Sequence, residues 1–186
     1  MIYVFLKQFI DHLNHEKIPT HIKNEADFEQ HFVIPIALKL LEYHPEILLY
    51  TNPWNNKVTC TPNCRSALKG NGNRVTGCPK CWKESEKWAS INAFGIKNTF
   101  DLAGRDPSGK TFAVEIKLVK ARNGRMPKEV IQRFIGQCFL ATLKHKSVIG
   151  ICGYLGDLNL TQEQHTIDAE HWLNKLGISI MFRRIM

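Results

Sequence analysis

The stretch Thr99–Lys120, TFDLAGRDPSGKTFAVEIKLVK, predicts two β-strands joined by a tight turn. Side chains alternate between the two faces of a strand, so the second strand presents two different sets of residues. One face carries Phe112, Val114, Ile116 and Leu118, and the other carries Ala113, Glu115, Lys117 and Val119. An aspartate, Asp101, precedes the turn on the first strand. The hairpin therefore holds two acids and a lysine that can act together if the strands pair in the right register.

The turn Asp106-Pro107-Ser108-Gly109 sets that register. Proline presets the first central φ of a type I turn, and glycine accepts the left-handed conformation that follows it. This combination favours a three-residue loop closed by a bulge at Gly109, which places Asp101 opposite Glu115. A plain two-residue loop would instead place Asp101 opposite Val114, on the other face. We therefore expect the two carboxylates to converge, with Lys117 on the same side.

Two converging carboxylates form a hard, anionic pocket that suits Mg²⁺ or Mn²⁺, which prefer oxygen ligands. The backbone carbonyl of Ile116 would add a third oxygen. A lysine beside such a pair can orient the attacking water and stabilise charge on a phosphate, which is the chemistry of phosphodiester hydrolysis. The alternative is an exposed polar sheet face on which Asp101, Glu115 and Lys117 form cross-strand salt bridges.

The rest of the chain predicts an α/β fold in which helices cover a central mixed sheet. Helical spacing or capping residues predict helices over 2–15, 24–43, 83–94, 128–143 and 168–176. Apolar runs predict further strands over 46–51, 147–154 and 178–182. Asn24 is the expected cap of the second helix, and Pro35 is expected to kink or divide it. We expect one domain over 1–186.

Four of the six cysteines form two close pairs, Cys60-x3-Cys64 and Cys78-x2-Cys81. Two such pairs on tight turns can supply four thiolates to a tetrahedral Zn²⁺ ion. The surrounding segment, 52–82, is polar and lacks a large core of its own, so we expect a zinc-binding insertion stabilised by its metal. The alternatives are four unligated thiols or a redox CxxC pair.

The chain of 186 residues carries a formal net charge of +8, and a pI of about 9.2, which suggests a polyanionic partner and nucleic acid before membrane. Basic residues of the predicted insertion could contact phosphates: Arg65, Lys69, Arg74, Lys80 and Lys83. Trp54 and Trp82 could stack on bases, but small zinc modules often use such residues for packing.

No apolar stretch approaches the ~20 residues that a membrane-spanning helix needs. The segment MIYVFLKQFIDHL lacks a basic start and a small-residue cleavage site, so it predicts an amphipathic helix and not a signal peptide. We therefore expect a cytoplasmic protein with no membrane partner.

Asp101, thirteen intervening residues and Glu115-Ile116-Lys117 resemble the active-site signature of the PD-(D/E)xK, or restriction-endonuclease-like, nuclease superfamily. The resemblance extends over roughly residues 25–155 and implies a central mixed β-sheet flanked by helices. It implies that Asp101 and Glu115 bind Mg²⁺ and that Lys117 is the catalytic lysine. In place of the motif's proline, this chain has Phe100.

Many members of that superfamily also use a glutamate on the first core helix. Glu29 is the best match here, and Glu25 is the second. Some members carry a glutamine on the helix after the ExK strand, and Gln137 fits that place.

These observations predict a Mg²⁺-dependent DNA endonuclease with a structural zinc insertion that helps to hold DNA. A non-catalytic, zinc-containing nucleic-acid-binding protein on the same scaffold is the alternative, and an RNA-directed or exonucleolytic enzyme is a third. Because breaking both strands of a duplex needs two sites, a homodimer is a reasonable expectation.

Overall fold

The computed structural model describes residues 1–51, 57–60, 64, 78–93 and 95–186, and within them a mixed six-stranded sheet forms the centre. Its strands are β2 (Lys57–Val58), β1 (Leu48–Thr51), β5 (Leu102–Arg105), β6 (Thr111–Lys120), β7 (Ser147–Leu155) and β8 (Ile178–Ile185), in this spatial order. The pairs from β2 to β6 are antiparallel, whereas β6–β7 and β7–β8 are parallel. No helix in the described ranges combines the length and apolar character needed to span a membrane.

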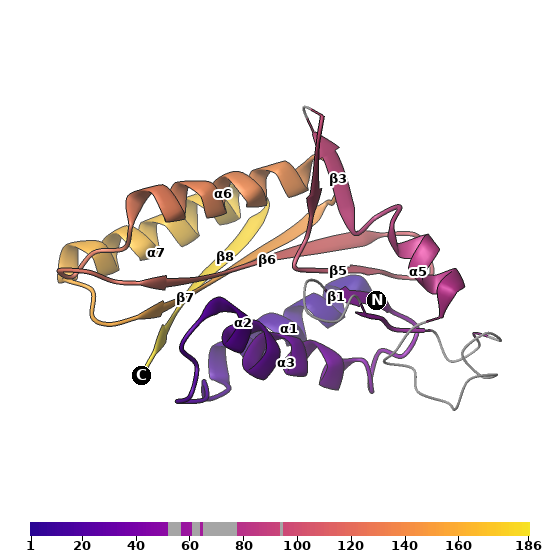
Figure 1. The fold of residues 1–186 in the computed structure, drawn as a ribbon, viewed down its shortest axis with the longest axis horizontal. Coiled ribbons are helices and arrows are strands. Elements are labelled where there is room, and N and C mark those ends of the chain that lie inside the picture. Colours follow the sequence, from indigo (N-terminus) through magenta and orange to yellow (C-terminus); the bar gives the residue numbers. More distant parts are fainter. Residues whose placement is uncertain (52–56, 61–63, 65–77, 94) are drawn as a thin grey trace.

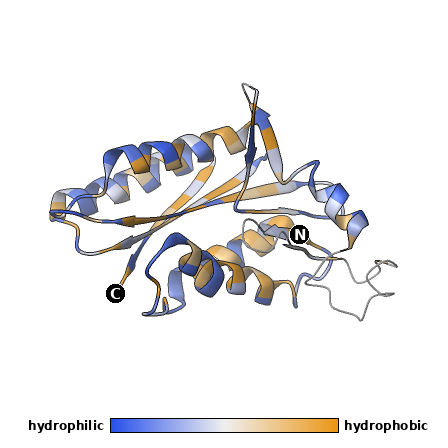
Figure 2. Cartoon of the chain, viewed as in Figure 1, coloured by the Kyte–Doolittle hydropathy of each residue, from blue (hydrophilic) through white to orange (hydrophobic). Residues whose placement is uncertain are grey.

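Helices cover both faces of the sheet, which gives the predicted α/β architecture (Figure 1). One layer holds α1 (Ile2–His15), α2 (Glu25–Phe28), η1 (Glu29–Val33) and α3 (Ile34–Leu40), and the other holds α6 (Lys128–Thr142) and α7 (Leu160–Lys175). Each layer packs on its own apolar core, and the two faces of β6 contribute to different cores. We call the core beneath α1, α2 and α3 the first core and the core beneath α6 and α7 the second core. Figure 2 shows apolar residues concentrated on the central strands and polar residues along the outer side of α6 and α7.

The β5–β6 hairpin has the predicted register. Leu102 pairs with Val114, and Arg105 pairs with Thr111. Gly109 has a positive φ of 84°, and its N–H donates to the Asp106 carbonyl at 2.9 Å, which closes the expected three-residue loop. The same register continued by one residue places Asp101 opposite Glu115, although Asp101 itself lies in a bend just outside β5.

The first helical layer also follows its sequence signals. The side chain of Asn24 caps α2 by accepting the N–H of Asp27 at 2.9 Å. Pro35 divides the following helix as predicted, and the division takes the form of the π-helical turn η1, in which Ile34 donates to the carbonyl of Glu29. Proline cannot donate a backbone hydrogen bond, and its ring crowds the preceding turn, so a wider turn is accommodated there. This turn carries Glu29 toward the sheet.

The predicted helix over 83–94 is wrong. Helix α5 runs over Pro79–Ser85, and the chain then forms a separate two-stranded hairpin of β3 (Ser90–Ala93) and β4 (Ile96–Thr99). Trp88 and Ala89 are buried in the second core, and the Ala89 carbonyl accepts the N–H of Phe100. Pairing with a later segment therefore overrides the local helical preference.

The last helix begins earlier than residue 168. It starts at Leu160, where the side chain of Asn159 accepts the N–H of Gln162, and ends before Gly177. Most of its apolar residues are exposed, among them Leu160, Ile167 and Trp172, so the sequence carries little of the periodicity that marks a buried helical face.

Candidate functional site

The predicted acids meet along one edge of β6. Strand β5 begins at Leu102, so the part of β6 beyond Val114 has no β5 partner on that edge. Two carboxylates replace the missing strand: Asp101 Oδ2 accepts the N–H of Ile116 at 2.7 Å, and Glu25 Oε2 accepts the N–H of Leu118 at 3.1 Å. The open edge of β6 thus organises acidic side chains, which would otherwise repel one another.

Asp101 and Glu115 lie close enough together for their carboxyl groups to influence each other's protonation. Glu115 is 5 % exposed. Burial raises the pKa of both groups, and the negative charge of Asp101 raises the pKa of Glu115 further. Repulsion between two neighbouring buried carboxylates favours the binding of a proton or of a divalent cation.

Lys117 lies at the half-exposed rim of this group. Its Nζ donates to Glu25 Oε1 at 2.8 Å. Because the second oxygen of Glu25 accepts the N–H of Leu118, the Glu25 carboxylate joins the lysine side chain to the backbone of its own strand. Lys117 is therefore held in one orientation beside Asp101 and Glu115. We call Glu25, Glu29, Asp101, Glu115 and Lys117 the carboxylate–lysine cluster.

Glu29, at the start of η1, is the most unusual member of the cluster. It is 3 % exposed, and its Oε2 is buried and has no hydrogen-bond partner among the residues that the structure describes. Burial raises its pKa to about 8, with further contributions from the charges of Asp101 and Glu25, while Lys117 acts in the opposite direction. A buried carboxylate oxygen without a partner indicates a site that is completed by a proton or a cation.

Two other predicted site positions are less closely tied to the cluster. Gln137 lies half buried on α6, and within the described residues it makes no hydrogen bond to the cluster, so its role stays a prediction. The next residue, Cys138, is buried, and the charges of Glu115 and Asp101 add to the effect of burial in raising its pKa. The N–H of Ile116 points to the open edge of β6. The carbonyl of Ile116 points the same way, because the N–H and the carbonyl of one strand residue lie on the same side of the strand.

The four clustered cysteines converge as predicted. The Sγ atom of Cys64 lies 3.6 Å from that of Cys78 and 3.7 Å from that of Cys81, and all four sulfurs, with Cys60, lie within 4.8 Å of one another. Four sulfurs at about 2.3 Å from a tetrahedral zinc ion would be about 3.8 Å apart. In the described ranges this is the one group of three or more His, Cys, Asp or Glu side chains close enough to hold a metal ion.

Local structure places two of these thiols. Cys78 caps α5, Pro79 begins the helix, and the N–H of Cys81 donates to the Cys78 sulfur at 3.4 Å. Burial raises the pKa of the Cys78 thiol, but hydrogen bonds from Cys81 and the other thiols outweigh this effect and lower it to about 7. Burial raises the pKa of Cys60 to about 11 and also raises that of Cys81, so the arrangement favours thiolate, the form that binds metal, at Cys78.

The cysteine cluster packs against the sheet. Cys60, Cys78 and Cys81 are buried in the second core. The Trp82 ring lies 5.7 Å from that of Tyr50 on β1, which supports the packing role of this tryptophan. Burial and then the charge of Asp101 raise the pKa of Tyr50.

The basic residues expected on the insertion are only partly described. Lys80 and Lys83 are exposed on α5. Arg65, Lys69, Arg74 and Trp54 lie outside the described residues, as does most of the predicted insertion, 52–82.

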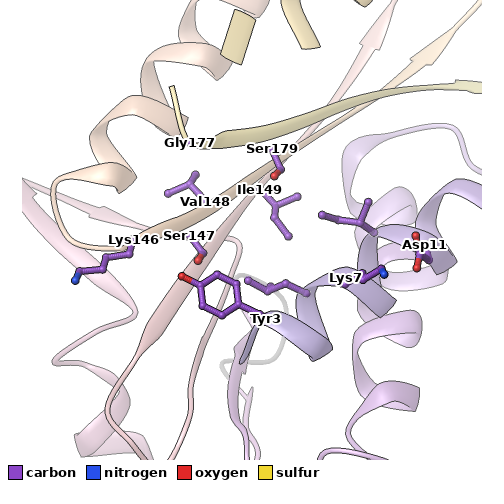
Figure 3. Close-up of a pocket in the computed structure, with 11 residues that line it drawn as sticks. Tyr3, Lys7, Asp11, Lys146, Ser147, Val148, Ile149, Gly177 and Ser179 are labelled. Atoms are coloured by element: carbon purple, nitrogen blue, oxygen red, sulfur yellow. The ribbon is translucent and has the colours of Figure 1, made fainter. Parts of the chain in front are cut away.

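A pocket of about 370 Å³ lies elsewhere, between α1 and the first residues of β7 and β8 (Figure 3). Tyr3, Lys7 and Lys146 surround an apolar floor that includes Val148 and Ile149. Its β7 residues lie beside the beginning of β6, because Ser147 pairs with Phe112, whereas Lys117 pairs with Cys152. This pocket is therefore separate from the carboxylate–lysine cluster.

No protein-family model, curated protein or solved structure matches this chain. Its function therefore has to be inferred from its own residues and their geometry.

Replacing Glu29 with glutamine should change how stability depends on pH. Between pH 4.5, the ordinary pKa of this group, and about pH 8, Glu29 is protonated in the folded chain and deprotonated in the unfolded chain. This group therefore favours folding at low pH, and its contribution falls by up to about 1.4 kcal/mol per pH unit as the pH rises through that window. Glu29→Gln should be more stable than wild type at pH 8 and nearly equal at pH 5.

Urea denaturation at both pH values without added divalent cation would measure this difference. Glu42→Gln makes the same chemical change at an exposed position in the turn after α3 and should leave the pH profile as in wild type. Parallel profiles for wild type and Glu29→Gln would contradict the burial of an unpartnered carboxyl at this position.

Proposed function

We propose that this protein is a Mg²⁺-dependent DNA endonuclease that hydrolyses phosphodiester bonds at the carboxylate–lysine cluster. One observation carries the proposal: Asp101 and Glu115 meet at the open edge of β6, with Lys117 beside them. Acids that repel one another are costly to gather in a buried place, and such groupings of titratable residues concentrate at functional sites.

The donor set fits a small divalent ion. Asp101, Glu115 and the carbonyl of Ile116 would hold Mg²⁺ or Mn²⁺ through oxygen, and the unpartnered Oε2 of Glu29 could accept a hydrogen bond from one of its waters. When bound, the ion would lower the pKa of a water molecule and stabilise charge on the phosphate. It would also replace the proton that burial otherwise keeps on the acids.

The chain's own side chains supply the remaining chemistry. Lys117 would stabilise the negative charge that develops on the phosphate and orient the attacking water. Glu25 fixes the orientation of the lysine by its hydrogen bond of 2.8 Å. We assign Glu25 to positioning, whereas Asp101, Glu115 and Lys117 act at the reacting atoms.

The arrangement of elements supports a restriction-endonuclease-like fold. The antiparallel strands β1, β5 and β6 are followed by the crossover helix α6 and the parallel strand β7, and the glutamates come from the first helical layer. This is the order that the PD-(D/E)xK resemblance implies. The four-cysteine cluster would hold a structural Zn²⁺ ion against the same sheet, and the net charge of +8 suits a DNA partner.

Incubation with covalently closed plasmid DNA tests the proposal. In the presence of Mg²⁺ the plasmid should become nicked or linear, and without added Mg²⁺ it should stay supercoiled. Because a closed circle has no ends, such cleavage would also exclude a purely exonucleolytic enzyme. Plasmid that is bound and retarded in a gel but stays intact with Mg²⁺ or Mn²⁺ would favour the non-catalytic DNA-binding alternative instead.

A further inference from the structure

A short hairpin directly after β6 carries two arginines. Arg122 and Arg125 form an isolated antiparallel bridge, with hydrogen bonds of 2.8 and 3.0 Å between their backbones. Asn123 and Gly124 between them both have positive φ, 51° and 71°, as a type I′ turn requires. Residues directly opposite each other in such a pair present their side chains on the same face. We call Arg122–Arg125 the arginine hairpin.

The start of α7 holds this hairpin in place. The N–H of Asn159 donates to the carbonyl of Gly124 at 2.9 Å. A Cβ atom on Gly124 would meet the backbone and side chain of Asn159 at 3.1–3.3 Å, so only glycine fits this approach. Just before the hairpin, the N–H of Ala121 donates to the Leu155 carbonyl at 2.8 Å. The two arginines are therefore displayed from a fixed backbone.

The hairpin carries a concentrated positive charge. Arg122 and Arg125 are exposed, and Lys120 and Lys128 flank them. Within the described ranges none of these four side chains forms an ion pair. Like charges directly opposite each other destabilise a strand pair, so the arrangement favours an anion between the two guanidinium groups.

The hairpin borders a pocket whose lining begins at Leu118, one residue after Lys117 on β6. The pocket, about 430 Å³ in volume, is lined by Leu118, Val119, Lys120, Arg122, Arg125 and Val130 among others. Leu118 follows Lys117, and its N–H is bound by Glu25 of the cluster. Arg122 is five residues beyond Lys117, a backbone reach of at most about 18 Å. Figure 1 shows α6 and α7 both beginning at this end of the sheet.

We infer that the arginine hairpin binds backbone phosphates of the DNA strand a few nucleotides from the bond that is cut. The inference rests on the proposed function, since the position of the cut is given by Lys117. Guanidinium groups bind phosphate oxygens in pairs and without regard to base sequence. The hairpin would therefore position the strand without selecting its sequence.

The test is the salt dependence of DNA binding by Arg122→Gln/Arg125→Gln, measured by fluorescence anisotropy with labelled single-stranded and duplex oligonucleotides. No divalent cation is added, so that the DNA stays intact. Each lost phosphate contact should reduce the slope of log affinity against log salt by about 0.9 for duplex or 0.7 for single strands, which is about fivefold in duplex affinity at 0.15 M salt. The double variant should therefore bind duplex about 25-fold more weakly.

Lys17→Gln/Lys175→Gln removes the same charge from exposed positions outside the pocket, one of them at the opposite end of α7, and should bind nearly as wild type. Equal losses in both double variants, or no loss in the hairpin variant, would overturn the inference, as would a wild-type chain that binds no DNA.

The proposed function is judged separately, by plasmid cleavage with Mg²⁺. A hairpin variant that binds weakly, in a protein that never cleaves, would leave the binding site supported and the nuclease proposal refuted. A wild type that cleaves plasmid, together with a hairpin variant that binds DNA normally, would support the nuclease proposal and refute the binding site.

Discussion

Lys117→Ala is expected to lower the rate of Mg²⁺-dependent plasmid cleavage by at least about 100-fold, because a positioned charge or proton-transfer group contributes about 10²–10⁴ to such reactions. The lysine is half exposed at the rim of the cluster, and its side chain is held by Glu25 alone among the hydrogen bonds of the described residues. Its removal leaves Glu25 able to be solvated, so the fold should persist. Initial rates of nicking, together with circular dichroism, measure both expectations.

Lys110→Ala is the matched control for this variant. Lys110 is exposed at the turn end of the same hairpin, and the part of β6 that follows it, Thr111 to Val114, is paired with β5 and is not part of the open edge. It loses the same charge and should cleave within about twofold of wild type, the scale expected of an exposed charge in DNA steering. Cleavage by Lys117→Ala at the wild-type rate would remove this residue from the active site and with it the assignment of the cluster.

Cys78→Ser should cost the protein its bound metal and much of its stability. Cys78 caps α5, and its sulfur lies 3.6 Å from that of Cys64 in a cluster packed into the second core. Structural zinc contributes about 10–16 kcal/mol of binding free energy in small zinc domains, so even partial loss should exceed about 3 kcal/mol. For a chain of this size, that would lower the melting temperature by at least about 6 °C.

Elemental analysis of purified protein should find about one zinc per wild-type chain and much less in Cys78→Ser. Cys152→Ala provides the control, because Cys152 is equally buried in the second core but lies outside the cluster. It should keep the zinc and lose only the smaller stability expected of a shortened core side chain. Zinc-free wild-type protein, or a Cys78→Ser variant that melts as wild type does, would refute the metal site.

Local sequence signals predicted several elements because the interactions that form them are local. Pro107 and Gly109 set the loop of the first hairpin, and the observed pairing of Leu102 with Val114 follows from that loop. Asn24 caps a helix through a residue three positions away. The prediction over 83–94 was wrong because the partner of this segment is another strand, which local periodicity does not reveal.

Part of the candidate site could also be predicted from the sequence. Asp101, Glu115 and Lys117 lie on one hairpin, so the turn chemistry was enough to bring them together, and the spacing of the cysteines was enough to indicate their cluster. Glu25 was named only as a second choice to Glu29, yet its carboxylate is hydrogen-bonded to Lys117, 92 residues away in the chain. The sequence analysis did not identify the arginine hairpin as a site, although Asn123-Gly124 is a strong turn signal that could have revealed it.

The amino-acid sequence alone was sufficient to predict the α/β class, the register of the β5–β6 hairpin and the clustering of the four cysteines. The folded chain was needed to show that β6 extends past β5 and that its unpaired N–H groups are bound by Asp101 and Glu25. It was also needed to show that Oε2 of Glu29 is buried without a hydrogen-bond partner in the described part of the chain, and that the arginines lie beside the same strand. The physical reason is that alternation and turns act between neighbours, whereas burial and charge depend on which distant segments pack together.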